Sequence, residues 1–246
     1  MHAYLTDLLR DQKGGVIFEC FGIWHILYMA VIFGAIGLCL FLLKGKSRKR
    51  AVEFAICFAF GLYVLDFFLM PFAYGQIDVE KLPFHACTAM CVLSFLSRRV
   101  KFLENFKGQF ALLGLLSNLV YVIYPAGVGW YQIHPLSYRV VQTLLFHGVM
   151  TAYGIFCLCF EDVRICWKNW KKELITVAGM TLWALLGNTI YNGLDGRFFN
   201  WFFVVRDPFY MLPKDLAPFA MPFLVTAVFF GVEMLIYLLF NSRRKH

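Results

Sequence analysis

Long apolar segments separated by short charged loops constrain this chain more than any other feature. A run of about 20 apolar residues is long enough to cross the hydrocarbon core of a bilayer as a helix. Hydrophobic residues make up 61% of the sequence, whereas about 45–50% is usual for soluble globular chains. Seven apolar segments can be drawn, at 21–43, 51–74, 83–97, 108–126, 138–160, 173–193 and 217–240. The sequence therefore predicts an all-α membrane protein with seven transmembrane helices.

Basic residues gather in alternate loops between these segments. Lys and Arg cluster at 44–50, 98–107, 164–172 and 243–245, whereas the second and fourth loops hold few of them. Because Lys and Arg concentrate on the cytoplasmic side of membrane proteins, this alternation predicts an N-terminus outside and a cytoplasmic C-terminus. The net charge of +8 thus indicates orientation in a cell membrane, and no nucleic-acid partner is expected.

Seven spans leave no room for a soluble domain in 246 residues, so a single membrane domain over residues 1–246 is expected. Residues 1–20 are charged and lack a small-residue cleavage pattern, so they are interpreted as an interfacial segment and not as a signal peptide. The aromatic loop 194–216 is interpreted as an extracytoplasmic loop or lid.

Several polar residues converge on one depth in this topology, near the outer ends of their spans. Polar side chains inside a membrane are costly, and each is by default a functional hypothesis. Their convergence predicts one cavity that opens outward. His25 could instead anchor the first helix, and Asp66 could be paired with Arg or His for packing alone. Glu53 and Glu233 are interpreted as partners of loop cations. The residues at the common depth are His25, Asp66, His85, Cys87, His147, Asn188, Tyr191 and Asn192.

Cys87 is the candidate nucleophile. Pro is favoured at the first position of a helix, so Pro83 is expected to start the third helix and to place Cys87 in its first or second turn. The helix dipole there favours a thiolate, and unpaired first-turn N–H groups can bind an anion. The alternative is that Cys87 is a small buried hydrophobic residue.

A thiol needs a base, and His147 from another helix is the candidate. His85 lies two residues before Cys87, about 200° away on an ideal helix, and is given a supporting catalytic role. These groups favour acyl transfer through an acyl-thioester, with membrane lipids as substrate and no cofactor.

Two other functions remain open. The cavity could capture or transport a small molecule. Alternatively His25, Asp66, His85 and His147 could hold a metal that activates water for lipid hydrolysis. Hydrolases related to alkaline ceramidase keep an HxxxH motif in their last span. The last span here has no histidine, which counts against this alternative, and no metal is predicted.

Four short motifs resemble the YwaF-type bacterial integral membrane proteins, whose animal relatives include an ether-phospholipid acyltransferase. The resemblance implies a seven-helix fold, an acyltransferase cysteine at Cys87 and a histidine at His147. Ala86 and Gly148 depart from the family pattern, which often has Leu and a second His there. The motifs are Phe-Gly-Ile-Trp-His at 21–25, Leu-Pro-Phe-His-Ala-Cys at 82–87, Phe-His-Gly at 146–148 and Gly-Asn-Thr-Ile-Tyr at 187–191.

Overall fold

The regular elements of the chain are helical throughout the residues that the computed structural model describes. These residues are 15–74, 79–125, 127, 132–161, 167–194, 199–208 and 210–243. The main helices are α2 (Ile23–Leu42), α3 (Lys46–Tyr74), α4 (Ala86–Ser97), α6 (Lys107–Ile123), α8 (Tyr138–Phe160), α9 (Trp170–Leu194) and α10 (Ala217–Arg243).

Each of the seven predicted apolar segments forms one of these helices, and the all-α prediction is confirmed. Five of them, α2, α3, α8, α9 and α10, are long and apolar enough to cross a membrane. The other two are shorter, with 12 residues in α4 and 17 in α6, whereas a span needs about 20. Seven crossings and the orientation of the termini therefore stay predictions, as does the single domain.

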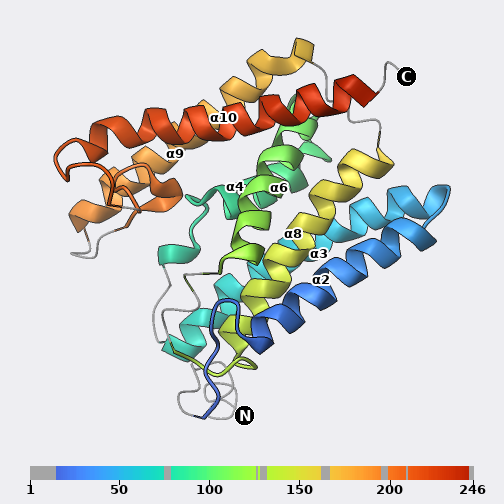
Figure 1. The fold of residues 1–246 in the computed structure, drawn as a ribbon, viewed down its shortest axis with the longest axis horizontal. Helices are drawn as coiled ribbons and strands as arrows, with labels where there is room; N and C mark the ends of the chain where they lie inside the picture. Colours follow the sequence, from blue (N-terminus) through green and yellow to red (C-terminus); the bar gives the residue numbers. More distant parts are fainter. Residues whose placement is uncertain are drawn as a thin grey trace. The chain divides into compact units, whose positions relative to one another are not determined.

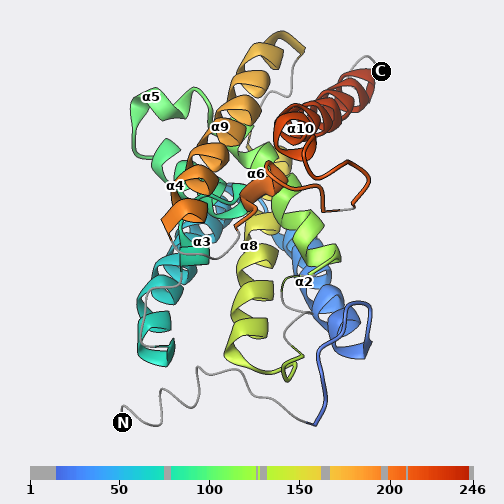
Figure 2. The same cartoon turned by 90° about the vertical axis from the view of Figure 1, so that its left-hand side faces the viewer.

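The chain divides into two compact units. Unit 1 comprises residues 1–81 and 114–162. Within it α8 packs against both α2 and α3, and Figure 2 shows it between them. The α2 contact is close at Gly148, where a Cβ atom would lie 3.0 Å from the Ile32 side chain. The small residue thus allows α2 and α8 to approach.

Unit 2 comprises residues 82–113 and 163–246. In this unit α9 and α10 run side by side (Figure 1), and the hydroxyl oxygens of Thr181 and Thr226 lie 2.8 Å apart between them. Helix α4 and the short η3 helix (Trp201–Phe203) also pack against α9. Helix α9 is therefore the element on which unit 2 is assembled.

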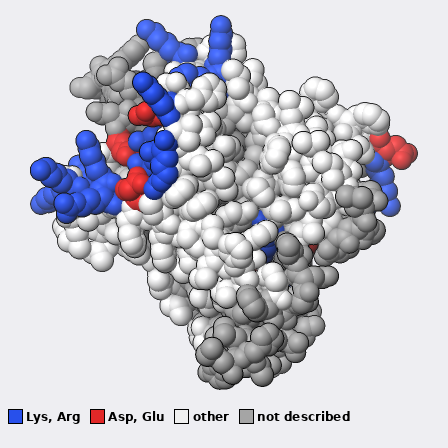
Figure 3. Space-filling view, turned by 180° about the vertical axis from the view of Figure 1, so that it is seen from behind, with Lys and Arg blue, Asp and Glu red and all other residues white. Residues whose placement is uncertain are grey.

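Large apolar side chains cover much of the helix surface. Phe41 on α2 is 80% exposed and Phe223 on α10 is 78% exposed. Lys and Arg side chains gather in groups, and broad areas of the face in Figure 3 carry no charge. Exposed apolar surface on this scale indicates contact with lipid.

Candidate functional site

His147 is held in a fixed orientation inside unit 1. Its Nδ1 atom lies 2.7 Å from Oδ1 of Asn118 on α6. Its ring stacks on Tyr121, also on α6, with the ring centres 4.0 Å apart and the planes inclined by 16°. The Thr151 hydroxyl donates to the His147 carbonyl oxygen at 2.8 Å. Side-chain and backbone contacts together fix this histidine.

A second hydrogen bond decides which ring nitrogen of His147 carries the proton. Nδ2 of Asn118 donates to the Gly114 carbonyl oxygen at 2.7 Å, so Oδ1 of the amide must be the atom that faces the ring. An amide oxygen only accepts, and Nδ1 therefore carries the hydrogen. In the neutral ring Nε2 is then the basic nitrogen, the atom through which this histidine accepts a proton.

His25 has a different environment in the same unit. Its Nδ1 accepts the Phe21 backbone N–H at 2.9 Å, and its Nε2 donates to the Val122 carbonyl oxygen at the same distance. The side chain is 0% exposed. Both nitrogens bind backbone, including that of Phe21, whose φ of 62° lies in the left-handed region. These contacts support the interpretation of His25 as an anchor of the first helix.

Asp66 forms a buried ion pair within unit 1. Its Oδ2 lies 2.7 Å from Nζ of Lys81, and the Asp66 side chain is 3% exposed. The Tyr63 hydroxyl donates to the Lys81 carbonyl oxygen at 2.9 Å, and the Tyr138 side chain also interacts with Asp66. Asp66 is thus ion-paired, but its partner is Lys81 of the short helix η1 (Val79–Lys81) and not the Arg or His that the sequence suggested.

The N-terminus of α4 carries Cys87 in unit 2. Helix α4 begins at Ala86 and its N-cap is His85, so Cys87 is the second helical residue and its predicted place in the first turn is confirmed. The prediction that Pro83 starts the helix is wrong. The Pro83 carbonyl oxygen accepts the Trp183 indole N–H at 2.7 Å, and Phe84 N–H donates to the Leu82 carbonyl at 2.7 Å, which holds 82–84 in a turn.

This turn is locked against α9. The Phe84 ring packs so closely on Gly187 that a Cβ atom there would lie 2.4 Å from it. His85 has extended backbone angles, with φ −78° and ψ 144°, so the angle expected between His85 and Cys87 on an ideal helix does not apply. The His85 side chain makes no capping hydrogen bond to the first turn of α4, and the Cys87 side chain is half-buried.

Asn188 and Asn192 lie one turn apart on α9 and bind the backbone of residues 199–201, where η3 begins. Asn188 accepts the Trp201 N–H at 2.9 Å and donates to its carbonyl oxygen at 3.1 Å. Asn192 accepts the Phe199 N–H at 2.5 Å and donates to its carbonyl oxygen at 3.0 Å. Both amides are thereby committed to the backbone of the predicted lid.

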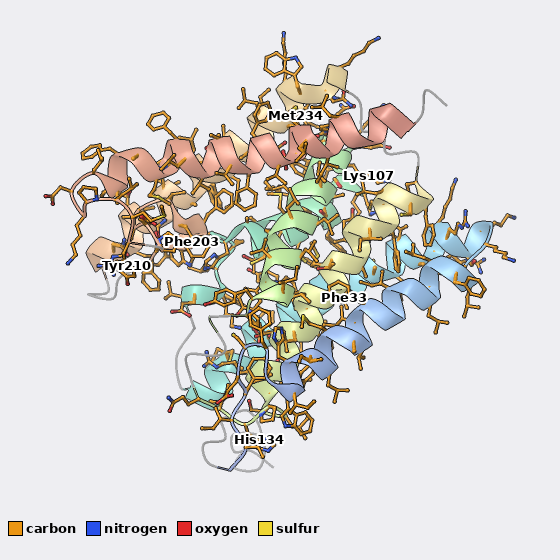
Figure 4. All side chains as sticks on the ribbon, viewed as in Figure 1. Phe33, Lys107, His134, Phe203, Tyr210 and Met234 are labelled. Atoms are coloured by element: carbon orange, nitrogen blue, oxygen red, sulfur yellow. The ribbon has the colours of Figure 1, made fainter. Side chains whose placement is uncertain are left out.

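Tyr191 lies in an aromatic cluster beside these amides. Its ring contacts Phe84, Phe199 and Trp201, with ring centres 5.6–6.4 Å apart. The chain then continues through Phe203 and Tyr210, labelled in Figure 4, toward α10. The cluster therefore ties the α4 turn and the start of the segment 199–216 to the same end of α9; residues 195–198 and 209 lie outside the described residues.

The predicted site residues divide between the units. Unit 1 holds His25, Asp66 and His147, whereas unit 2 holds His85, Cys87, Asn188, Tyr191 and Asn192. The single outward cavity stays a prediction. Within the described ranges no group of three His, Cys, Asp or Glu side chains is placed to hold a metal.

Asn118 is the functional candidate that sequence reasoning did not assign. Its signal was present, because it is an amide in the middle of an apolar segment. Its partner could not be found from spacing, since His147 follows 29 residues later on another helix.

Comparison with known proteins identifies the family. The model of the TMEM164 family matches residues 20–240, which include all seven apolar segments. No curated protein and no solved structure matches the chain. Together with the long apolar helices, the match identifies a multi-pass membrane protein. The chain belongs to the TMEM164 family.

Proposed function

We propose that this chain is a membrane-embedded acyltransferase or transacylase acting on lipid acyl chains in a cell membrane. Cys87 is the nucleophile and His147 the general base. The observation that carries the proposal is the hydrogen bond from His147 Nδ1 to Asn118 Oδ1. With Nδ1 as the donor, Nε2 is the nitrogen that accepts the proton; papain-like proteases also combine Cys, His and Asn.

The proposed acyl transfer has two steps. The Cys87 Sγ attacks the acyl carbonyl carbon of a donor lipid while His147 Nε2 takes the thiol proton. The carbon–oxygen ester bond breaks, and His147 returns the proton to the leaving oxygen, which leaves an acyl-thioester on Cys87. An acceptor hydroxyl, deprotonated by His147, then attacks the thioester, and the Cys87 thiolate that leaves takes the proton back from His147.

The N-terminus of α4 supports the role of Cys87. The first-turn N–H groups of a helix have no intrahelical partner, and the N-cap residue His85 makes no side-chain hydrogen bond to those of α4. They can donate to the oxyanion that forms on the acyl carbonyl, where one such donor typically contributes about 10²–10³-fold in rate. His85, as the N-cap residue, has the supporting role of shaping this turn.

The experiment follows the acyl-thioester. The chain in lipid vesicles is incubated with a phospholipid that carries a tagged acyl chain, and hydroxylamine-sensitive label on the protein is measured. We expect label on the wild type but none on Cys87→Ala. Cys159→Ala is the control, because it removes an exposed thiol that is not part of the proposed site, and it should be labelled like the wild type. Equal labelling of Cys87→Ala and the wild type contradicts the proposal.

Functional coupling tests the base. Residues that act as one catalytic unit are not additive. The double variant Cys87→Ala, His147→Ala should therefore transfer acyl groups no more slowly than Cys87→Ala. An additional loss of 100-fold in the double variant contradicts a joint Cys-His mechanism.

A further inference from the structure

Unit 2 contains two fully buried acids that the proposed chemistry does not use. Glu173 on α9 and Glu233 on α10 are both 0% exposed. Each lies in a helix long and apolar enough to cross a membrane. Among the described residues Glu233 pairs with no loop cation, and neither of its carboxyl oxygens has a hydrogen-bond partner there, so its interpretation as the partner of a loop cation is not supported.

Glu173 is held by neutral donors. Its Oε1 accepts from Nε2 of Gln109 on α6 at 3.0 Å and from the hydroxyl of Tyr237 on α10. Its Oε2 accepts no hydrogen bond. The Glu233 carboxyl interacts directly with that of Glu173. Three carboxyl oxygens of the pair thus lack a hydrogen donor, and the fully buried Glu233 faces the site that Gln109 and Tyr237 form around Glu173.

Nearby lysines do not neutralise this pair. Lys172 donates from Nζ to the Asn105 carbonyl oxygen at 3.1 Å, and Lys171 lies over the Trp170 ring. Within the described part of the chain neither Glu173 nor Glu233 forms an ion pair. The groups that face the two carboxyls from the surrounding helices are Gln109 of α6 and Tyr237 of α10.

Two adjacent carboxylates without a cation are too costly to keep in an apolar interior. We propose that Glu173 and Glu233 form a proton-binding site in which the pair holds one proton. Glu233 carries it, because no donor stabilises its anion, and its O–H donates to Glu173 Oε2. Glu173 then accepts from Gln109, Tyr237 and Glu233. One proton removes one of the two charges and supplies the missing donor to Glu173.

Infrared difference spectroscopy of the full chain in lipid nanodiscs tests this site, because a protonated carboxyl has a carbonyl band that a carboxylate lacks. We expect this band at neutral pH in the wild type, its loss in Glu233→Gln, and its shift in Tyr237→Phe, which weakens the network without removing an acid. Glu53→Gln on α3 is the control and should retain the band unshifted.

Three results would each overturn the site. The first is a wild-type band that Glu233→Gln leaves in place, and the second is the absence of any band in the wild type. The third is a bound cation in place of the proton, seen by isothermal titration with Na⁺, Ca²⁺ or Mn²⁺ as stoichiometric binding that Glu233→Gln abolishes. The inference is independent of acyl transfer, since neither result depends on Cys87 or His147.

Discussion

Two buried histidines of unit 1 bind the same helix and differ in the partner that accepts their ring N–H. His25 donates to the Val122 carbonyl and His147 donates to the Asn118 side chain, and these partners lie one turn apart on α6. The other nitrogen of His25 accepts a backbone N–H. In His147 the other nitrogen is Nε2, the basic atom of the tautomer that Asn118 selects.

The buried fraction of a histidine side chain does not by itself indicate the role of that histidine. His25 is 0% exposed and His147 5% exposed, so exposure does not separate them. The partner does: the His25 ring donates to a backbone carbonyl, whereas the His147 ring donates to the side-chain amide of Asn118. Variants that affect the transfer rate and the stability of the fold differently test whether the two histidines have different roles.

The largest effect is expected for His147→Ala. Loss of a general base typically lowers the rate by about 10²–10⁴-fold, measured as acyl transfer in vesicles per mole of folded protein. His134→Ala is the control, since His134 lies in the loop before α8 of the same unit and accepts the Leu136 N–H. A loss below tenfold in His147→Ala would remove the distinction between the two histidines.

His25→Ala should act on stability instead. It leaves the Phe21 N–H and the Val122 carbonyl without their partner, and each unsatisfied buried group costs about 1–3 kcal/mol. Thermal unfolding in detergent should therefore occur at a lower temperature, while the transfer rate of the folded fraction stays within a few-fold of the wild type. A loss of transfer with unchanged unfolding would give His25 a catalytic role.

Asn118→Ala tests the bond that sets the tautomer. Loss of a hydrogen bond to a buried group costs about 1–3 kcal/mol, which corresponds to about 5–150-fold in transfer rate. Asn118→Asp keeps an acceptor and should recover part of the rate. Ser117→Ala is the matched control, because the Ser117 hydroxyl also donates to the Gly114 carbonyl. Equal rates in Asn118→Ala and Ser117→Ala would contradict the assignment.

The smallest effect is expected for Gly148→Ala, which tests the contact between the helices that carry the two histidines. The new Cβ would lie 3.0 Å from the end of the Ile32 side chain. Overpacking typically destabilises a protein by about 1–3 kcal/mol, and we expect this small clash to lie near about 1 kcal/mol. Gly61→Ala on α3 has nothing within 4 Å and should be neutral or stabilising. Similar melting temperatures for the two variants would contradict a close α2–α8 contact.

The sequence alone determined the helices of this protein. Each predicted segment forms a helix, because the apolar composition and charged boundaries of a membrane helix are local properties of the chain. Even Cys87 was placed correctly in the first turn of α4. Pro83 was misplaced at the helix start, because its carbonyl is bound by Trp183, which lies 100 residues later.

The contacts of the polar residues became known only from the tertiary structure. Spacing in the sequence could not show that Asp66 pairs with Lys81, that Asn118 orients His147, or that Glu233 faces Glu173. A hydrogen bond or ion pair depends on the positions of single atoms, and helix packing sets these positions between residues far apart in the chain. The apolar pattern therefore specifies which segments form helices, and packing specifies the polar contacts between them.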